Sequence, residues 1–192
     1  MTLRLALLVL LLGLPTRAAA QQGVASDSQS PISLLLDVAA FRLEVLLDGQ
    51  VVREFAVAVG AAAYPTPAGA FTIRHIEFNP SWTPPESPWA DGQVRMPPGP
   101  RNPMGRAKIQ FAPLYFLHGT PDTASIGKAA SHGCVRLHNR DILALAELLL
   151  VHAAPSVDDS TRHALLADAH GTRRVPLDLP VPLTILPRRP AP

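Results

Sequence analysis

Residues 131–140 read SHGCVRLHNR and contain Cys134, the only cysteine in the 192-residue chain. His132 precedes this cysteine by two positions, and His118 lies sixteen positions upstream in the stretch FLHGT. A thiol attacks carbonyls as its thiolate, and a nearby imidazole can lower its pKa or accept its proton. Gly133 gives the backbone freedom to turn and to aim N–H groups at one point. The stretch therefore predicts a reactive thiol, and a buried cysteine that only packs in the core is the competing interpretation.

The segments around the cysteine predict a mainly β domain. Residues 32–60 contain alternating apolar and polar stretches with a hairpin signal at Asp48–Gly49, which predicts a β-meander. Residues 71–76 predict a short strand, and residues 109–117 predict another strand that ends at His118. The proline-rich stretch VPLDLPVPLTIL at 175–186 predicts one or two edge strands.

Two helices are expected in the second half of the chain. NRDILALAELLLVH at 139–152 consists largely of good helix formers, and Asn139 is the expected N-cap. A second helix is expected over residues 159–169, before Gly171. The sequence contains no internal repeats, so we expect a single domain that combines a β-sandwich or barrel with these two helices.

A long loop is expected at residues 79–105, which are rich in proline. A loop of this length without secondary structure is unusual in a compact domain and is more often functional. Its two tryptophans, Trp82 and Trp89, can line a groove or anchor the loop to the core. We expect that at least one of them anchors the loop.

The first twenty residues predict an export signal. Arg4 precedes an apolar run at 5–14, and three alanines end the segment at Ala20. The apolar run is shorter than the roughly 20 residues that span a bilayer, so we expect cleavage after Ala20 and no lasting membrane anchor. The expected organisation is a signal peptide at 1–20, a flexible lead-in at 21–31, the domain at 32–188 and a tail at 189–192.

The composition excludes several classes of partner. Without residues 1–20, which contain two arginines and no acid, basic and acidic residues balance, so no charge excess indicates nucleic acid. Aromatic residues make up only 5% of the chain, too few for a base-stacking platform. No paired-carboxylate pattern supports a glycosidase. Hydrophobic residues make up 47%, which is enough for a packed core.

Several motifs of the chain resemble, in their sequence and in their order, those of the L,D-transpeptidases of the YkuD type, cysteine enzymes that cross-link peptidoglycan. SHGCVRL resembles their signature, and the similarity extends over about residues 32–187. The other matching motifs are PTPAGAF at 65–71, PRNPMG at 100–105, FLHGT at 116–120, IG at 126–127, N-x-D at 139–141 and VPLDLPVPLTI at 175–185. Met104 replaces the commoner leucine of the second of these motifs, a mild exchange.

The resemblance implies catalytic roles for five residues. Cys134 matches the nucleophile, and His118 matches the group that accepts and returns its proton. Gly119 matches the position whose backbone carbonyl orients that histidine. His132 and Gly133 match the residues that frame the oxyanion hole.

Four polar residues are the candidates for substrate binding. Ser131, Arg136 and Asn139 match polar positions that order the cleft, and Thr120 of the FLHGT motif is a further candidate for substrate binding. Arg136 carries a fork-shaped cation that suits a substrate carboxylate or an acidic structural partner, and the resemblance favours a carboxylate of the stem peptide.

The resemblance also implies a two-step reaction in the periplasm or cell envelope. Cys134 would attack the carbonyl between the diamino acid at position three and the D-Ala of a tetrapeptide stem, releasing D-Ala and forming a thioester. An amine of another stem would then form a 3→3 cross-link, whereas water would give L,D-carboxypeptidase activity. Related enzymes attach or detach wall proteins by the same intermediate. The reaction needs no metal or organic cofactor, and carbapenems are expected to acylate the cysteine.

Two other function classes remain open at this point. A zinc site could use His118, His132, Cys134 and His138, although the spacing neither pairs cysteines nor places histidines along a helix. A wall-binding protein without activity is the second alternative. The histidines outside the motifs are expected to be structural or exposed: His75, His138, His152, His163 and His170.

Overall fold

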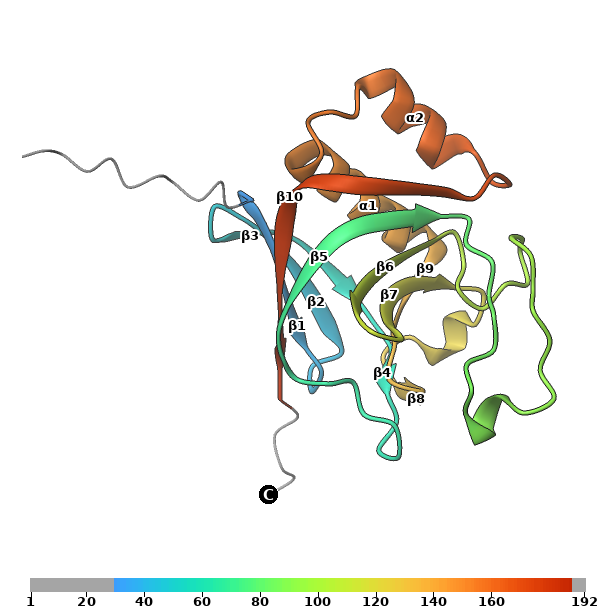
Figure 1. The fold of residues 1–192 in the computed structure, drawn as a ribbon. Coiled ribbons are helices and arrows are strands. Elements are labelled where there is room, and N and C mark those ends of the chain that lie inside the picture. Colours follow the sequence, from blue (N-terminus) through green and yellow to red (C-terminus); the bar gives the residue numbers. More distant parts are fainter. Residues whose placement is uncertain (1–29, 188–192) are drawn as a thin grey trace, which may run out of the picture.

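A computed structural model of the chain describes residues 30–187, so the predicted signal peptide and all but the end of the predicted lead-in lie outside the described residues. An eight-stranded sheet in the order β3-β2-β1-β10-β5-β6-β7-β9 forms most of the fold, and β4 pairs with β8 in a second small sheet (Figure 1). The elements are β1 Ile32–Asp37, β2 Arg42–Leu47, β3 Gln50–Ala56, β4 Val59–Gly60, β5 Gly69–Phe78, β6 Ala107–Ala112, β7 Tyr115–Thr120, β8 Ala129–Ser131, β9 Val135–His138, α1 Asn139–Ala153, α2 Asp159–Ala167 and β10 Arg173–Leu186, with 3-10 turns at Pro88–Ala90 and Thr123–Ser125.

The predicted β-meander is confirmed for β1 to β3. These strands pair in antiparallel order, and their buried positions alternate with partly exposed ones in β1 and most of β2. Asp48 and Gly49 form the connection with φ values of 48° and 79°, the left-handed pair that a two-residue hairpin requires. Val59 and Gly60 leave the meander, because they pair in parallel with β8.

The predicted strand at 109–117 is wrong, because this stretch contains a hairpin. β6 and β7 are antiparallel neighbours, and Pro113 and Leu114 form the turn between them. Leu114 adopts a φ of +66°, which is rare for a residue other than glycine. The apolar residues on both sides of the turn resemble one strand, although Pro113 between them is a signal for a break. As a result, His118 lies inside β7 and pairs with Lys108 of β6.

The prediction of edge strands at 175–186 is also wrong, because β10 lies in the interior of the sheet between β1 and β5. Its pairing with β1 begins only at Leu183. The three prolines, Pro176, Pro180 and Pro182, all precede that residue. Pro176 and Pro182 pair with β5 alone, and Pro180 lies in the irregular stretch between Pro176 and Val181. None of them therefore needs an N–H between two strand partners.

Both predicted helices are present, but Asn139 is not the N-cap. The capping position of α1 is His138, and no side chain caps the helix. The Asn139 side chain accepts a hydrogen bond from the N–H of Arg106 instead (2.9 Å). α2 ends at Ala167, two residues earlier than predicted, and the Asp158 side chain caps its start.

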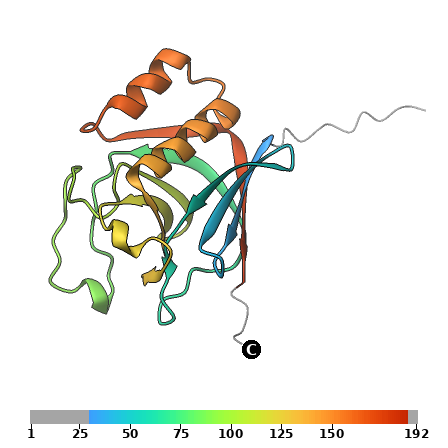
Figure 2. The ribbon, with the colours of Figure 1, turned by 180° about the vertical axis from the view of Figure 1, so that it is seen from behind.

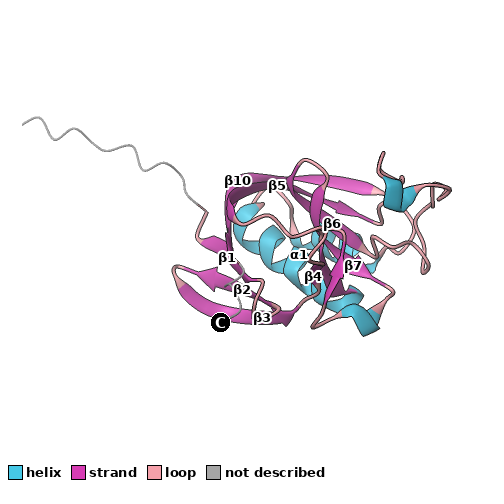
Figure 3. Ribbon diagram, turned by 90° about the horizontal axis from the view of Figure 1, so that it is seen from below, coloured by secondary structure: helices cyan, strands magenta, loops and turns pink. Residues whose placement is uncertain are grey.

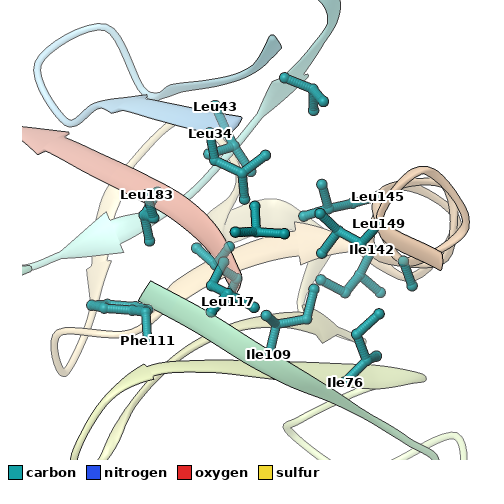
Figure 4. Close-up of a cluster of buried hydrophobic side chains, with 14 of the residues drawn as sticks. Leu34, Leu43, Ile76, Ile109, Phe111, Leu117, Ile142, Leu145, Leu149 and Leu183 are labelled. Atoms are coloured by element: carbon teal, nitrogen blue, oxygen red, sulfur yellow. The ribbon is translucent and has the colours of Figure 1, made fainter. Parts of the chain in front are cut away.

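The main core lies between α1 and the sheet that curves around it (Figure 3). Ile142, Leu145 and Leu149 recur at helical spacing and point from α1 toward strand residues such as Ile109 and Leu117 (Figure 4). Fully burying a side chain of this kind contributes roughly 1.5–3 kcal/mol. α2 lies at the end of the molecule opposite β4 and β8 (Figure 2).

The sheet nearly closes on itself. β3 and β9 are the two edge strands of the sheet. Ala58, just after β3, exchanges two backbone hydrogen bonds of 2.9 Å with Arg136 of β9, so the two edges are joined. The predicted class, a β-sandwich or barrel with two helices in the C-terminal half, is confirmed. No helix within residues 30–187 is both long and apolar enough to cross a membrane.

Candidate active site

The site is built on two parallel strands, β7 and β9, which pair Leu117 with Val135 and His118 with Arg136. Side chains alternate across a strand. Leu117 and Val135 are fully buried in the core, so His118 and Arg136 project from the opposite face. Cys134 immediately precedes β9, and its Sγ lies 3.7 Å from the carbonyl oxygen of Leu114 in the β6–β7 turn. The thiol is thus held against the start of the strand that carries His118.

His118 is held by the backbone. Its side chain is buried, and its Nδ1 lies 2.6 Å from the carbonyl oxygen of Gly119, the contact that the resemblance implies. A carbonyl oxygen only accepts, so Nδ1 carries the proton and Nε2 remains an acceptor in the neutral ring. Burial lowers the pKa of His118 to about 4, although the Gly119 carbonyl opposes this shift. The ring is therefore neutral at pH 7.

The thiol of Cys134 is also neutral at rest. Burial raises the pKa of Cys134, and the hydrogen bond with the backbone of Phe116 and the charge of Arg136 oppose this shift. Burial disfavours the charged form of both groups. The resting pair is thus thiol and imidazole rather than thiolate and imidazolium.

Two hydroxyl groups fix the turn that carries Cys134. Ser131 Oγ donates to the carbonyl of Cys134 (2.5 Å) and accepts from the N–H of Gly133 (3.1 Å), and Thr66 Oγ1 donates to the carbonyl of Gly133 (3.0 Å). Gly133 has a φ of +102°, and a Cβ at this position would lie 2.5 Å from the Tyr115 ring. The position therefore requires glycine for both conformation and space. Because the Gly133 N–H already has a partner, its part in an oxyanion hole stays a prediction.

His132 lies in a different environment, on the exposed side of the turn. Its ring stacks on Trp89 at a centroid distance of 4.0 Å and an interplanar angle of 8°, and Tyr64 lies 4.8 Å away. Burial, followed by the charge of Arg136, lowers the pKa of His132.

Trp82 is buried and pairs with Met96 through the backbone. This pairing lies within the loop itself, so the expectation that a tryptophan anchors the loop to the core stays a prediction for Trp82, whereas Trp89 contacts His132.

Arg136 has an acidic partner in this structure. Its guanidinium lies 3.3 Å from Asp122, whose carboxylate side chain is 58% exposed. The backbone N–H of Asp122 donates to the hydroxyl of buried Thr120 (3.1 Å). An ion pair this exposed is worth roughly 0–1 kcal/mol, so a carboxylate arriving from outside can replace Asp122 at little cost.

Asn139 connects the site to the PRNPMG motif. Its side chain contacts Gly119 and Gly105 closely enough that a Cβ on either glycine would collide with it. Arg106, whose N–H it binds, donates through its guanidinium to the carbonyls of Leu166 and Asp168 near the end of α2. Asn139 therefore holds the end of that motif beside His118.

Four residues near the site were not identified from the sequence as site residues. Thr66 lies in the quoted motif PTPAGAF, which is the signal that could have identified it. Tyr115 and Trp89 are recognisable only once the chain is folded. Asn102 is buried and holds the long loop by donating to the carbonyls of Pro80 and Pro97, among others.

The zinc alternative lacks its ligand set. Across the described residues 30–187, no three histidine, cysteine, aspartate or glutamate side chains gather closely enough to hold a metal ion. The grouping of His118, His132, Cys134 and His138 that the alternative requires is therefore not assembled.

Sequence comparison identifies similar proteins. Residues 31–173 match the family model of the L,D-transpeptidase catalytic domain, YkuD. YkuD of Bacillus subtilis (strain 168), which is named as an L,D-transpeptidase, is 29% identical over 120 residues, 62% of this chain and 61% of that protein. ErfK/SrfK of Escherichia coli (strain K12), also named as an L,D-transpeptidase, is 34% identical over 118 residues, 57% of this chain and 38% of that protein. The match thus covers less than two thirds of either relative.

Solved structures share the fold. The catalytic domain of the E. faecium L,D-transpeptidase superimposes with a TM-score of 0.52 at 15% identity and covers 83% of this chain and 99% of that domain. L,D-transpeptidase 3 from Mycobacterium tuberculosis, in complex with a faropenem-derived adduct, superimposes with a TM-score of 0.51 at 15% identity, covering 81% of this chain and 60% of that one.

Proposed function

Because the chain belongs to the family of L,D-transpeptidase catalytic domains, we propose that it is an exported cysteine L,D-transpeptidase that acts on peptidoglycan stem tetrapeptides. The contact between His118 Nδ1 and the Gly119 carbonyl is the observation that carries the proposal. In a neutral imidazole with this contact, Nε2 is left as the acceptor. The ring is on β7, and Cys134 contacts the carbonyl of Leu114 just before that strand. This arrangement suits a general base that acts on a neutral thiol.

In the first step, Sγ of Cys134 attacks the carbonyl between the third stem residue and the terminal D-Ala. The thiol proton moves to His118 Nε2 as the S–C bond forms. The C–N bond to D-Ala then breaks, and His118 returns the proton to the leaving amine. A thioester on Cys134 and free D-Ala are the products. The low pKa of His118 favours the second transfer, since it makes the imidazolium a strong acid.

In the second step, the amine of another stem attacks the thioester. His118 accepts a proton from this amine, and the departing sulfur of Cys134 regains one. The product is a 3→3 cross-link. Attack by water instead gives a tripeptide, the carboxypeptidase outcome, and the same thioester can attach or detach a wall protein.

The polar residues around Cys134 are proposed to bind and orient the stem. Arg136 can exchange exposed Asp122 for a stem carboxylate. Ser131 fixes the turn of Cys134 and Asn139 fixes the backbone at Arg106, and Thr120 orders the segment of Asp122. His132 and the N–H groups of the Gly133 turn are proposed to face the oxyanion.

We place this activity outside the cytoplasm, since peptidoglycan lies there and residues 1–20 have the pattern of a signal peptide. β-Lactams are useful probes of the thiol, since the M. tuberculosis neighbour is described with a faropenem-derived adduct. We propose that carbapenems and related β-lactams acylate Cys134.

Intact-protein mass spectrometry tests the proposal. The reduced protein is incubated with a tetrapeptide-containing muropeptide or with faropenem, beside a Cys134→Ala control. We expect an adduct on Cys134 and released D-Ala, neither of which appears in the control. A 3→3 dimer as product identifies a transpeptidase, and a tripeptide identifies a carboxypeptidase. A folded protein that forms no adduct with either compound contradicts the catalytic proposal and favours a wall-binding role.

A further inference from the structure

One residue from each of five adjacent strands forms a continuous row across the sheet. The backbone register pairs Arg174 of β10 with Glu77 of β5, Glu77 with Lys108 of β6, Lys108 with His118 of β7, and His118 with Arg136 of β9. Side chains at directly paired positions lie on the same face of a sheet. His118 therefore has a cation on each side, one from each neighbouring strand.

Each of these two cations has its own acidic partner. Lys108 Nζ lies 3.2 Å from Glu77, and Arg136 lies 3.3 Å from Asp122. The two pairs differ in exposure, since the Lys108 and Glu77 side chains are only 20% and 19% exposed, whereas Asp122 is 58% exposed. Solvent and salt therefore screen the first pair less than the second.

Lys108 is held in place by more than its charge. Its Nζ lies 5.3 Å from the centre of the Phe116 ring, and Phe116 lies on the same face as His118, two residues earlier in β7. The aromatic face attracts the ammonium group. The charge thus stays beside His118.

We propose that Lys108 and Glu77 are positioning residues that set the proton affinity of His118, with Lys108 weakening it and Glu77 moderating that effect. The proposal rests on the proposed function for its consequence in catalysis. After the thiol proton has moved to His118, a nearby cation disfavours the imidazolium and speeds proton return to the leaving amine. The same cation makes the ring a weaker base in the first transfer.

The surroundings of His118 allow the effect to be assigned to this pair. The charged and polar groups around the ring are Lys108 from β6, Arg136 from β9 and the carbonyls of Gly119 and Pro103. The charge of Arg136 lowers the pKa of both His118 and Cys134. Of these two groups, Lys108 lowers the pKa of His118 alone. Lys108 is therefore the cation that changes the histidine without changing the nucleophile.

The proposal predicts shifts of opposite sign from two substitutions. Lys108→Met removes the charge and keeps an unbranched chain against Phe116, and it should raise the pKa of His118. Glu77→Gln leaves Lys108 without its partner and should lower that pKa. We expect each change in proton affinity to be on the order of threefold to tenfold, as for one charge acting in a partly buried site. The double variant should resemble Lys108→Met.

NMR titration of the His118 ring in the labelled full chain measures these shifts without substrate. Lys128→Met, at the only other lysine, is the matched control because that side chain is exposed. If the protein unfolds in acid before His118 titrates, the pH dependence of the free energy of unfolding yields the same pKa through proton linkage. Shifts of the same sign, or none, overturn the proposal. Opposite shifts in a protein that never releases D-Ala would reject the proposed function and leave the electrostatic inference intact.

Discussion

His118, on the strand paired with β9, and His132, two residues before Cys134, differ in burial and in what holds the ring. His118 is buried inside β7, and the Gly119 carbonyl fixes its tautomer. His132 lies on an exposed turn and is held by the rings of Trp89 and Tyr64, which belong to two separate loops. Proton transfer requires a fixed tautomer and a controlled pKa, and only the strand region supplies both. The loop region supplies an adaptable surface that suits substrate contact.

Replacing each histidine in turn should produce the largest difference between these regions. We expect His118→Ala to slow acylation of Cys134 by about 10²–10⁴-fold at neutral pH, the usual contribution of a general base. His132→Ala should cost about tenfold or less, since it removes a positioned ring but no proton acceptor. The rate of faropenem adduct formation measures both, with His163→Ala in exposed α2 as control. A greater loss in His132→Ala would show that the base is assigned to the wrong residue.

The burial of His118 should also make stability depend on pH. Its folded pKa of about 4 lies below the ordinary 6.5, so between these values the unfolded chain binds a proton that the folded chain does not. Stability should therefore fall as the pH drops from 6.5 to 4, by about 3 kcal/mol from this residue alone. Urea unfolding at several pH values measures the slope. His118→Gln should lose this part of the slope, whereas His132→Gln should retain it.

Gly133 lies between exposed His132 and Cys134. Its replacement tests whether the turn needs glycine because of the nearby Tyr115 ring or only because of its positive φ. Gly133→Ala places a methyl group against the Tyr115 ring at a φ of +102°, and we expect a loss of about 1–3 kcal/mol in unfolding free energy. Gly127 is the matched control, because it has a φ of +82° and a Cβ added there would meet no atom within 4 Å. Gly127→Ala should cost only the backbone strain, about 1 kcal/mol. Equal losses would mean that contact with Tyr115 contributes nothing.

The sequence predicts the strands that pair with their neighbours along the chain, but not the pairings that depend on distant segments. Alternation and the Asp48–Gly49 signal predict the meander because they depend on neighbouring residues alone. The sequence prediction misses the pairing of His118 with Lys108, because it treats the apolar residues on both sides of Pro113 as one strand, although a proline inside such a run indicates a break. The interior position of β10 depends on contacts with strands far away in sequence.

The site residues divide in the same way. Cys134 and its neighbours are identifiable from one short motif, and Thr66 lies in another. The stacking of Trp89 on His132 brings together positions 43 residues apart, with three strands between them in the sequence. No local pattern encodes such a contact, and a tryptophan that anchors a loop looks the same in sequence as one that lines a site.

The smallest effect is expected for Trp89 itself. Trp89→Leu removes a stacked aromatic pair worth about 0.5–1.5 kcal/mol. Because Trp89 is only half-buried, stability should change little, whereas acylation should slow by a few-fold as His132 loses its support. Trp82→Leu provides the contrast, since Trp82 of the same loop is buried and its loss should lower stability by more. If Trp89→Leu slows acylation only in a background that retains His132, the tryptophan acts through that ring. If Trp89→Leu slows acylation equally when it is added to His132→Ala, Trp89 contacts the substrate directly. The loop that contains Trp89 would then bind substrate without His132.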